Sequence, residues 1–314
     1  MASLEKSARV SRIPGANTLL TSRENRHLKE FRMALRGGLP TDLGFVGVEG
    51  VRLTEEALRS GCEIHAVLFS ESGERHRERL APFLDRPEIA IPLLHTTDRL
   101  FEGLADTERP QGVAALVKPR TPTFADLLRT PEPACSPLLV VLAGIQDPGN
   151  VGTIVRTAAA FGGTGAITAA SGISGTANPF SPKALRASAG AALHIPILSG
   201  PALASLHAQL KSANVKTIAS TLAESSDKSR PVAPWEIDWC QPVALLVGNE
   251  GAGLPEDVER DADFRIRIPM ASRIESLNAA AAAAVLFYEA ARQRNAISTK
   301  RIQNPVATHP FKLT

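Results

Sequence analysis

The sequence predicts an α/β protein whose C-terminal half is built on a parallel sheet. Strand-like and helix-like segments alternate along the chain, which is typical of helices that cover the faces of a sheet. The segment LLVVLAGI, residues 138–145, is apolar throughout, as expected of a strand that is buried on both faces. The length of 314 residues fits two domains.

A proline-rich stretch separates the two predicted domains. Residues 118–137 contain five prolines, a density that is typical of a linker. We therefore expect a first domain over residues 1–117 and a second domain over residues 138–296. The polar remainder, residues 297–314, is predicted to form a C-terminal tail.

The expected elements follow from the spacing of apolar residues. In the first domain, Ser22–Leu35 predicts a basic amphipathic helix, because its apolar residues recur at helical spacing. The other elements expected there are strands at residues 44–50, 64–69, 89–94 and 112–117, and helices at residues 54–60 and 74–84. The second domain is expected to contain strands at residues 138–145, 165–170, 215–220, 243–248 and 264–270, and helices at residues 151–162, 181–193, 203–210 and 277–294.

The composition argues against several classes of protein. The three cysteines are far apart and form no Cys-x-x-Cys pair, so neither a disulfide framework nor a metal site is expected. The longest apolar run, residues 279–288, is shorter than the roughly 20 residues that cross a bilayer. The N-terminal residues lack the apolar core of a secretory signal. We therefore expect a cytoplasmic protein with no membrane partner.

Charge is distributed unevenly along the chain. The first 36 residues carry eight basic and three acidic side chains, a net charge of +5, whereas the whole chain carries +3. Such a run fits a segment that faces a polyanion, although a solvated basic surface is its commoner origin.

A turn followed by a helix is the first place in the second domain that carries polar chemistry. In the turn QDPGN, Asn150 is placed to cap the helix at residues 151–162 by accepting a backbone N–H. Arg156 lies six residues further on, in an otherwise apolar stretch. It is either a surface arginine or a group that points into a cleft at the carboxyl ends of the strands, where open α/β sheets bind ligands.

A glycine-rich loop is the second place. Gly248, Gly251 and Gly253 follow a buried strand, so the backbone there can approach a bound molecule closely. Glu250, within this loop, is either exposed or holds a backbone group or an arginine. The G-x-x-G-x-G spacing argues against a dinucleotide-binding loop, which has G-x-G-x-x-G after an early strand.

The start of the last helix is the third place. Either Ser276 or Asn278 can cap this helix, which begins with six alanines at Ala279–Ala284. Alanines favour a helix and give it a slim face. Such a face permits close packing against another helix, within the domain or across a dimer.

Taken together, these segments resemble the signature motifs of the SpoU (TrmH-like) branch of the SPOUT RNA 2′-O-ribose methyltransferases. The three motifs are matched in order by DPGNVGTIVRTAAAFG, VALLVGNEGAGL and IPMASRIESLNAAAAAAVLFYE, and a further family segment is matched by SPKALRASAGAALHIPI. The small ribosomal-protein-like RNA-binding domain of many members is matched by LLTSRENRHLKEFRMALR, FVGVEGVRLTEEAL and LADTERPQGVAALV. The resemblance covers residues 18–294.

The resemblance implies a fold, a cofactor and a set of site residues. The implied fold is a parallel-sheet domain with a deep trefoil knot, preceded by a small α/β/α RNA-binding domain, and members generally form homodimers through the knotted domains. The implied cofactor is S-adenosylmethionine, bound mostly through backbone groups. The matching cofactor positions are Gly248, Ile268 and Leu277, and Thr221 and Leu222 are expected to line the same pocket. The matching catalytic positions are Arg156, Asn150, Glu250, Ser276 and Asn278.

The reaction implied by the resemblance is methyl transfer from a sulfonium to a ribose 2′-oxygen of RNA. The nucleophile must be aligned, and the hydroxyl must lose its proton as the bond forms. Arg156 is expected to assist, although arginine is a poor base because its pKa exceeds about 12. Either its proton is lost in a desolvated pocket, or it acts electrostatically while a phosphate or a water takes the proton. Arg156 and the ribose are expected to be positioned by Asn150, Glu250 and Ser276. Asn278 is expected to hold the loop or the substrate.

RNA capture is expected from the basic N-terminal segment, where the candidate phosphate contacts are Arg23, Arg26, Lys29, Arg32 and Arg36. The scarcity of aromatics in this segment argues against stacking on single strands, so a folded RNA is expected. The first domain favours ribosomal RNA over tRNA by analogy with the family. The alternatives are a tRNA methyltransferase, a non-catalytic RNA-binding or ribosome-assembly factor on the same fold, and a nucleotide-binding α/β enzyme.

Overall fold

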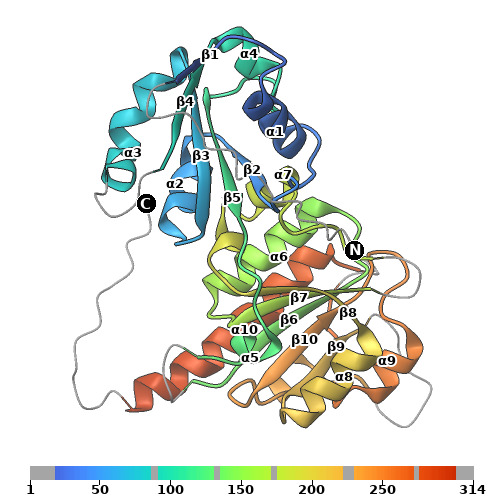
Figure 1. The fold of residues 1–314 in the computed structure, drawn as a ribbon. Coiled ribbons are helices and arrows are strands. Elements are labelled where there is room, and N and C mark those ends of the chain that lie inside the picture. The colour runs from blue at the N-terminus through green and yellow to red at the C-terminus, as the bar shows by residue number, and fades with distance from the viewer. Residues whose placement is uncertain are drawn as a thin grey trace, which may run out of the picture. The chain divides into compact units, whose positions relative to one another are not determined.

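The computed structural model describes residues 18–85, 91–130, 135–170, 175–221, 230–271 and 276–301. The chain divides into two compact units after Pro119 (Figure 1). Each unit has its own sheet. The limits predicted for the two domains, the linker and the tail stay predictions.

The first unit is built on a five-stranded mixed sheet with the order β1-β4-β3-β5-β2. Its strands are β1 (Thr18–Leu20), β2 (Val46–Glu49), β3 (Glu63–Ser70), β4 (Leu93–Thr96) and β5 (Val113–Lys118). Strands β1, β4 and β3 are parallel, whereas β5 runs antiparallel to both β3 and β2.

Helices lie on both faces of this sheet (Figure 1). They are α1 (Arg26–Leu35), α2 (Val51–Arg59), the 3-10 turn η1 (Ser72–His76), α3 (Arg77–Leu84) and α4 (Asp98–Glu102). Leu28 and Phe31 of α1 pack in one apolar core with Leu116 of β5. Ala115, which precedes Leu116 in β5, is also fully buried. Because successive side chains of a strand point to opposite faces, both faces of the sheet are covered. The unit is therefore the predicted α/β/α sandwich.

Some boundaries in the first unit differ from those expected. The helix predicted from residue 22 begins at Arg26, because the Asn25 side chain accepts a hydrogen bond from the His27 N–H and caps it. The helix expected at residues 74–84 is divided into η1 and α3. Part of the strand predicted at residues 89–94 lies outside the described residues.

The second unit is built on a six-stranded sheet with the order β11-β9-β10-β6-β7-β8. Its strands are β6 (Leu138–Ala143), β7 (Gly165–Ala170), β8 (Ile197–Ala202), β9 (Lys216–Ser220), β10 (Val243–Val247) and β11 (Phe264–Ile266). Every neighbouring pair is parallel, which confirms the predicted parallel sheet. The trefoil knot stays a prediction.

Helices cover both faces of the second sheet as well (Figure 1). The helices α5 (Phe124–Leu127), α8 (Leu203–Ser212) and α9 (Glu256–Asp261) pack on the face that carries Leu139 and Val141. The others are α6 (Pro148–Ala160), α7 (Pro182–Ala187) and α10 (Ala279–Arg301), with the 3-10 turns η2 (Ala191–Leu193) and η3 (Pro234–Glu236). Helix α5 lies within the residues predicted as a linker. In the part of the chain that the structure describes, no helix combines the length and the apolar character needed to cross a membrane.

The second half of α10 is joined to the amino-terminal side of the sheet by one arginine. The Arg294 guanidinium donates hydrogen bonds to the carbonyl oxygens of Ser136, Pro137, Trp239 and Gln241 at 2.6–3.2 Å. Burial lowers the pKa of Arg294 from its ordinary value, but the four carbonyl groups compensate for part of its lost hydration. This contact joins α10 to the segments that lead into β6 and β10.

We expect Arg294→Met to lower the free energy of unfolding of the second unit by about 2–4 kcal/mol, because several buried carbonyl groups lose their donor. Urea unfolding followed by tryptophan fluorescence measures this change, since both tryptophans, Trp235 and Trp239, lie in the second unit. Arg292→Met is the matched control, because Arg292 is an exposed residue of the same helix that pairs only with Glu289 among the described residues. Equal unfolding midpoints for the two variants would contradict the role given to Arg294.

Candidate active site

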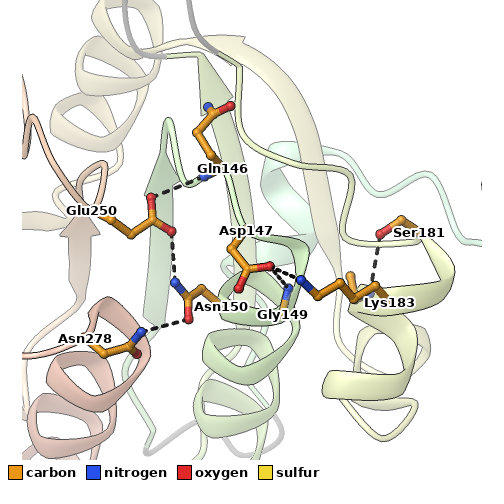
Figure 2. Close-up of polar contacts among 9 residues, drawn as sticks. Gln146, Asp147, Gly149, Asn150, Ser181, Lys183, Glu250 and Asn278 are labelled. Atoms are coloured by element: carbon orange, nitrogen blue, oxygen red, sulfur yellow. Dashed lines mark hydrogen bonds and ion pairs between the residues drawn. The ribbon is translucent and has the colours of Figure 1, made fainter.

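A chain of hydrogen bonds connects three separate segments at the carboxyl ends of β6 and β10 (Figure 2). The Asn278 side-chain amide donates from Nδ2 to Asn150 Oδ1 at 3.1 Å. Asn150 Nδ2 donates in turn to Glu250 Oε1 at 2.9 Å. Glu250 Oε2 accepts from the backbone N–H of Gln146 at 3.4 Å. The turn before α6, the loop after β10 and the start of α10 are thereby held together.

The charge of Glu250 fixes the direction of this chain. Burial opposes ionisation of its carboxyl group, but hydrogen bonds from the Asn150 amide and from backbone N–H groups outweigh that effect, so the pKa of Glu250 lies below its ordinary value. An ionised carboxylate only accepts hydrogen bonds, so Asn150 must turn its NH₂ group to Glu250 and its oxygen to Asn278. Asn278 Oδ1 is then free to accept from the N–H groups of Ala280 and Ala281.

Both predicted helix caps are tested by these contacts. Asn278 is the residue that caps α10, whereas the capping role predicted for Asn150 is wrong. Asp147 caps α6 instead, by accepting a hydrogen bond from the Gly149 N–H at 3.0 Å, and Pro148 occupies the first helical position. Asn150 is the third residue of α6, where its side chain is available to Glu250.

The glycine loop has a compact shape that the Asn249 side chain maintains. Asn249 and Gly253 exchange two backbone hydrogen bonds, and Asn249 Oδ1 accepts from the N–H groups of Gly251 and Ala252. Its Nδ2 donates to the carbonyl oxygen of Gly144 at 2.8 Å, beyond the end of β6. A Cβ atom at Gly248 would lie 2.3 Å from the carbonyl carbon of Gly253, so only glycine fits there without moving the loop.

Beside this loop lies a cleft of about 440 Å³. Four of the five predicted cofactor positions line it, namely Gly248, Ile268, Leu277 and Thr221. The fifth, Leu222, lies outside the described residues. Three of the predicted catalytic residues line it too, namely Glu250, Ser276 and Asn278. Asn150 joins them through its two hydrogen bonds.

Arg156 stands apart from the cleft. It is exposed on α6, lines no part of the cleft, and makes no hydrogen bond or ion pair with the residues that the structure describes. Six residues along a helix correspond to a rotation of about 240°, so Arg156 and Asn150 project from different sides of α6. Within one chain, the structure does not bring these two side chains together.

Two contacts hold the turn before α6 in place. Asp147 Oδ1 accepts from Lys183 Nζ of α7 at 2.6 Å (Figure 2), and this bond, with the Gly149 N–H, lowers the pKa of Asp147. Gly152 lets α6 approach α7 closely, because a Cβ atom there would lie 2.2 Å from the Ala184 carbonyl oxygen. The position of Asn150 therefore depends on α7 as well as on the sheet.

Sequence reasoning missed several residues that shape this site. They include Gln146, which precedes Asp147 in the turn before α6, and Asn249, which lies between the predicted residues Gly248 and Glu250. The signal for Asn249 was its position in a glycine-rich turn, where asparagine bonds its own backbone. Glu259 of α9 also lines the cleft, and its carboxylate accepts from Arg265 Nη2 of β11 at 3.4 Å. The sequence gives no comparable signal for Glu259.

The basic residues proposed for RNA capture lie on or next to α1 in the first unit. Arg23, Arg26, Lys29 and Arg36 are exposed, whereas Arg32 is half-buried. Two of them form ion pairs within this segment, Arg26 with Glu30 and Lys29 with Glu24. The Arg26 and Lys29 side chains are 63% and 52% exposed, so each can exchange its carboxylate for another anion.

The fold and the cleft define a class of protein. A parallel α/β sheet with a cleft at the carboxyl ends of its strands is a ligand-binding domain. The model of the SpoU rRNA methylase family matches residues 137–288 of this chain. The model of the RNA 2′-O ribose methyltransferase substrate-binding domain matches residues 48–123.

Known proteins match nearly the full length of the chain. The 23S rRNA (guanosine(2553)-2′-O)-methyltransferase RlmP of Bacillus subtilis is 30% identical, over 86% of this chain and 97% of the relative. The 23S rRNA (uridine(2479)-2′-O)-methyltransferase of Streptomyces viridochromogenes is 30% identical, over 91% of this chain and 96% of the relative. The crystal structure of the AdoMet-bound rRNA methyltransferase from Sinorhizobium meliloti matches with a TM-score of 0.73 and 30% identity. The match covers 88% of this chain and 97% of that chain.

The chain belongs to the SpoU family of RNA methyltransferases. The resemblance predicted from the three motifs and from the N-terminal segments is confirmed. The predicted fold class is confirmed apart from the knot. The predicted enzymatic class, a methyltransferase that uses S-adenosylmethionine, is also confirmed. The roles of individual site residues stay predictions.

We expect the second unit to lose stability on acidification partly through Glu250. Because its pKa is lowered in the folded chain, its ionised form stabilises the fold above the ordinary glutamate pKa of about 4.3, and this contribution is lost as the pH falls below it. The decline in unfolding free energy between about pH 6 and pH 3, followed by tryptophan fluorescence, is expected to be smaller in Glu250→Gln.

The control is Glu256→Gln, because Glu256 is an exposed carboxylate of α9 that makes no hydrogen bond to the described residues. This variant is expected to follow the pH dependence of the unchanged protein. If Glu250→Gln follows it too, the carboxylate does not hold the three segments together.

Proposed function

We propose that this protein transfers a methyl group from S-adenosylmethionine to a ribose 2′-hydroxyl of large-subunit ribosomal RNA, and that it acts as a homodimer. The observation that carries the proposal is the chain of hydrogen bonds through Asn278, Asn150 and Glu250 at the edge of the cleft. It places two side-chain amides and a carboxylate beside a space of ligand size, in a family that methylates RNA.

The cleft fits the proposed cofactor in size and in charge. Its volume of about 440 Å³ lies in the usual range of small-molecule sites, about 300–1,000 Å³. The carboxylates of Glu250 and Glu259 and the guanidinium of Arg267 border it, among apolar side chains such as Leu286. S-adenosylmethionine supplies a methyl group activated by a sulfonium. It also carries an ammonium, a carboxylate and an apolar adenine, which the carboxylates, the guanidinium and the apolar side chains of this lining complement.

Asn150, Asn278 and Ser276 are proposed to position the ribose. After the hydrogen bonds described above, each of the two amides keeps a second N–H that none of the described residues accepts. Both N–H groups can donate to a ribose or phosphate oxygen. Because Glu250 and the α10 backbone fix the amide orientations, the donors are pre-organised, which reduces the entropy cost of alignment.

Arg156 is proposed to reach the ribose of a neighbouring site in a homodimer. Helices α6 and α10 run side by side in the same direction, since Asn150 meets Asn278 near their starts and Phe161 meets Tyr288 further on (Figure 1). The exposed surface of this helix pair includes Arg156 on α6, and Val285 and Tyr288 on α10, which are 42% and 59% exposed. Pairing of two copies through this surface covers the apolar residues and carries Arg156 toward the partner's cleft.

The first unit is proposed to bind the RNA through its phosphates. The exposed Arg23, Arg26, Lys29 and Arg36 present positive charge along α1, which gives affinity that falls with salt and reads little sequence. Two relatives are named as methyltransferases of 23S rRNA, which favours ribosomal RNA over tRNA. A cytoplasmic location is consistent with this substrate.

Deleting the gene is expected to remove one or a few 2′-O-methyl groups from large-subunit ribosomal RNA. Transcriptome-wide mapping of ribose methylation, with and without the gene, measures this directly. Re-expression of the unchanged protein is expected to restore the lost signal, whereas Asn278→Ala is not. A loss confined to tRNA would overturn the ribosomal assignment, and no loss in any RNA would overturn the proposed function.

Arg156→Ala and Asn150→Ala are each expected to abolish methyl transfer while binding S-adenosylmethionine within a few-fold of the unchanged protein. If Arg156 acts across a dimer, a mixture of the two inactive variants regains activity, because half of the dimers then contain one complete site. Random exchange predicts recovery to about a quarter of the normal rate. Methyl transfer to RNA and calorimetric cofactor binding are the two measurements.

Arg129→Ala is the matched control, since Arg129 is an exposed arginine of the same unit that pairs only with Asp126 among the described residues. It is expected to keep full activity. Retained turnover in Arg156→Ala would remove Arg156 from the reaction, and no recovery in the mixture would place both residues in a site formed by one chain.

A further inference from the structure

Three side chains of the first unit meet at the contact between α1 and β3, away from the cleft described above. His27 and Glu30 lie one turn apart on α1, and His65 lies on β3. Each offers one nitrogen or oxygen ligand atom, and these atoms all lie within 4.8 Å of one another. Imidazole and carboxylate groups at this spacing are a ligand set for a divalent transition metal.

His65 occupies an irregularity in the sheet. The pairing of β3 with β5 shifts between Ile64 and Ala66, so His65 is an extra residue in the ladder. Such bulges redirect a side chain and are frequent next to functional sites. The His65 ring packs against the Phe45 ring, with centroids 4.6 Å apart, which restricts its orientation.

One carboxylate oxygen of Glu30 and the ring of His27 make no hydrogen bond to the described residues. Arg26 donates to Glu30 Oε1 at 3.1 Å, whereas Glu30 Oε2 is buried and has no hydrogen-bond partner. His27 Nδ1 lies 3.6 Å from that oxygen. His27 is only 8% exposed, and its ring makes no hydrogen bond to the described residues. A buried acceptor without a donor is costly, so the arrangement calls for a further group between these atoms.

We propose that His27, Glu30 and His65 bind one Zn²⁺ ion. Ligand atoms around a tetrahedral zinc ion lie roughly 3.3 Å apart, given Zn–N and Zn–O bonds of about 2.0–2.2 Å. The 3.6 Å between His27 Nδ1 and Glu30 Oε2 is close to that spacing, so small side-chain rotations complete the site. The fourth position is left to a water molecule.

The expected role of the ion is to fasten α1 to the sheet. Two ligands come from α1 and one from β3, so the ion joins the helix that carries the proposed phosphate contacts to the central part of its own unit. It also replaces an unpartnered carboxylate oxygen by a site of net charge +1, next to Arg26. The proposal does not depend on the assignment of the methyl transfer, because it concerns the first unit alone.

The test uses the full chain without a polyhistidine tag, stripped of metal by a chelator and desalted. Titration with zinc chloride against a chromophoric chelator is expected to give one tight site per chain. Glu30→Gln and His65→Gln are expected to weaken it by at least about 100-fold. Replacing zinc with Co²⁺ is expected to produce the visible absorption of a tetrahedral site, which these variants lose.

His207→Gln is the matched control, because His207 is a half-buried histidine on α8 of the second unit. It is expected to bind zinc as the unchanged protein does. Circular dichroism without metal shows whether each variant folds, and the cobalt spectrum of the unchanged protein tests the site even if a variant does not. The proposal is overturned if the unchanged protein takes up no zinc, or if Glu30→Gln and His65→Gln bind it equally well.

Discussion

The ionised carboxylate of Glu250 organises three segments that are far apart in the sequence. Because a carboxylate can only accept hydrogen bonds, its charge decides which way the Asn150 amide faces. Asn150 then decides the orientation of Asn278, and Asn278 can cap α10 only in that orientation. The start of the last helix is thus tied electrostatically to the loop after β10. A neutral residue at position 250 leaves both amides free to rotate, which removes the pre-organisation that alignment of a substrate requires.

This exposed network is effective because the backbone beneath it is rigid. The strands β6 and β10 are completely buried, and close packing around them leaves little freedom to the turns that follow. Gly248 and Gly152 allow backbone contacts that any side chain would prevent, at the loop and between α6 and α7. Arg294 holds α10 about four turns from its start, so this helix is fixed at its start and again further along. The site therefore combines exposed polar groups with a scaffold that holds them in place.

The sequence predicts the fold well where burial is continuous and poorly where it is not. Strands β6 and β10 were predicted because every residue in them is apolar. Strand β8 was missed because it is an edge strand with a single buried residue and contains Gly200 and Pro201, so it has no apolar periodicity. The cap of α6 was misplaced because Asn150 and Asp147 are both good caps, and only the proline after Asp147 distinguishes them. The cluster of His27, Glu30 and His65 was missed because a bulge and a helix contact create it, and sequence spacing records neither.

The charge of the cleft limits how RNA can approach it. The carboxylates of Glu250 and Glu259 border it, which suits a cofactor with a net positive charge but repels a phosphate. A ribose can approach only with its phosphates, so cations must be supplied near the cleft. Arg267 lines the cleft itself, whereas Arg156 is directed away from it within the same chain. The proposed role of Arg156 in a neighbouring copy follows from this direction, because pairing through α6 and α10 would also cover the exposed Val285 and Tyr288 of α10.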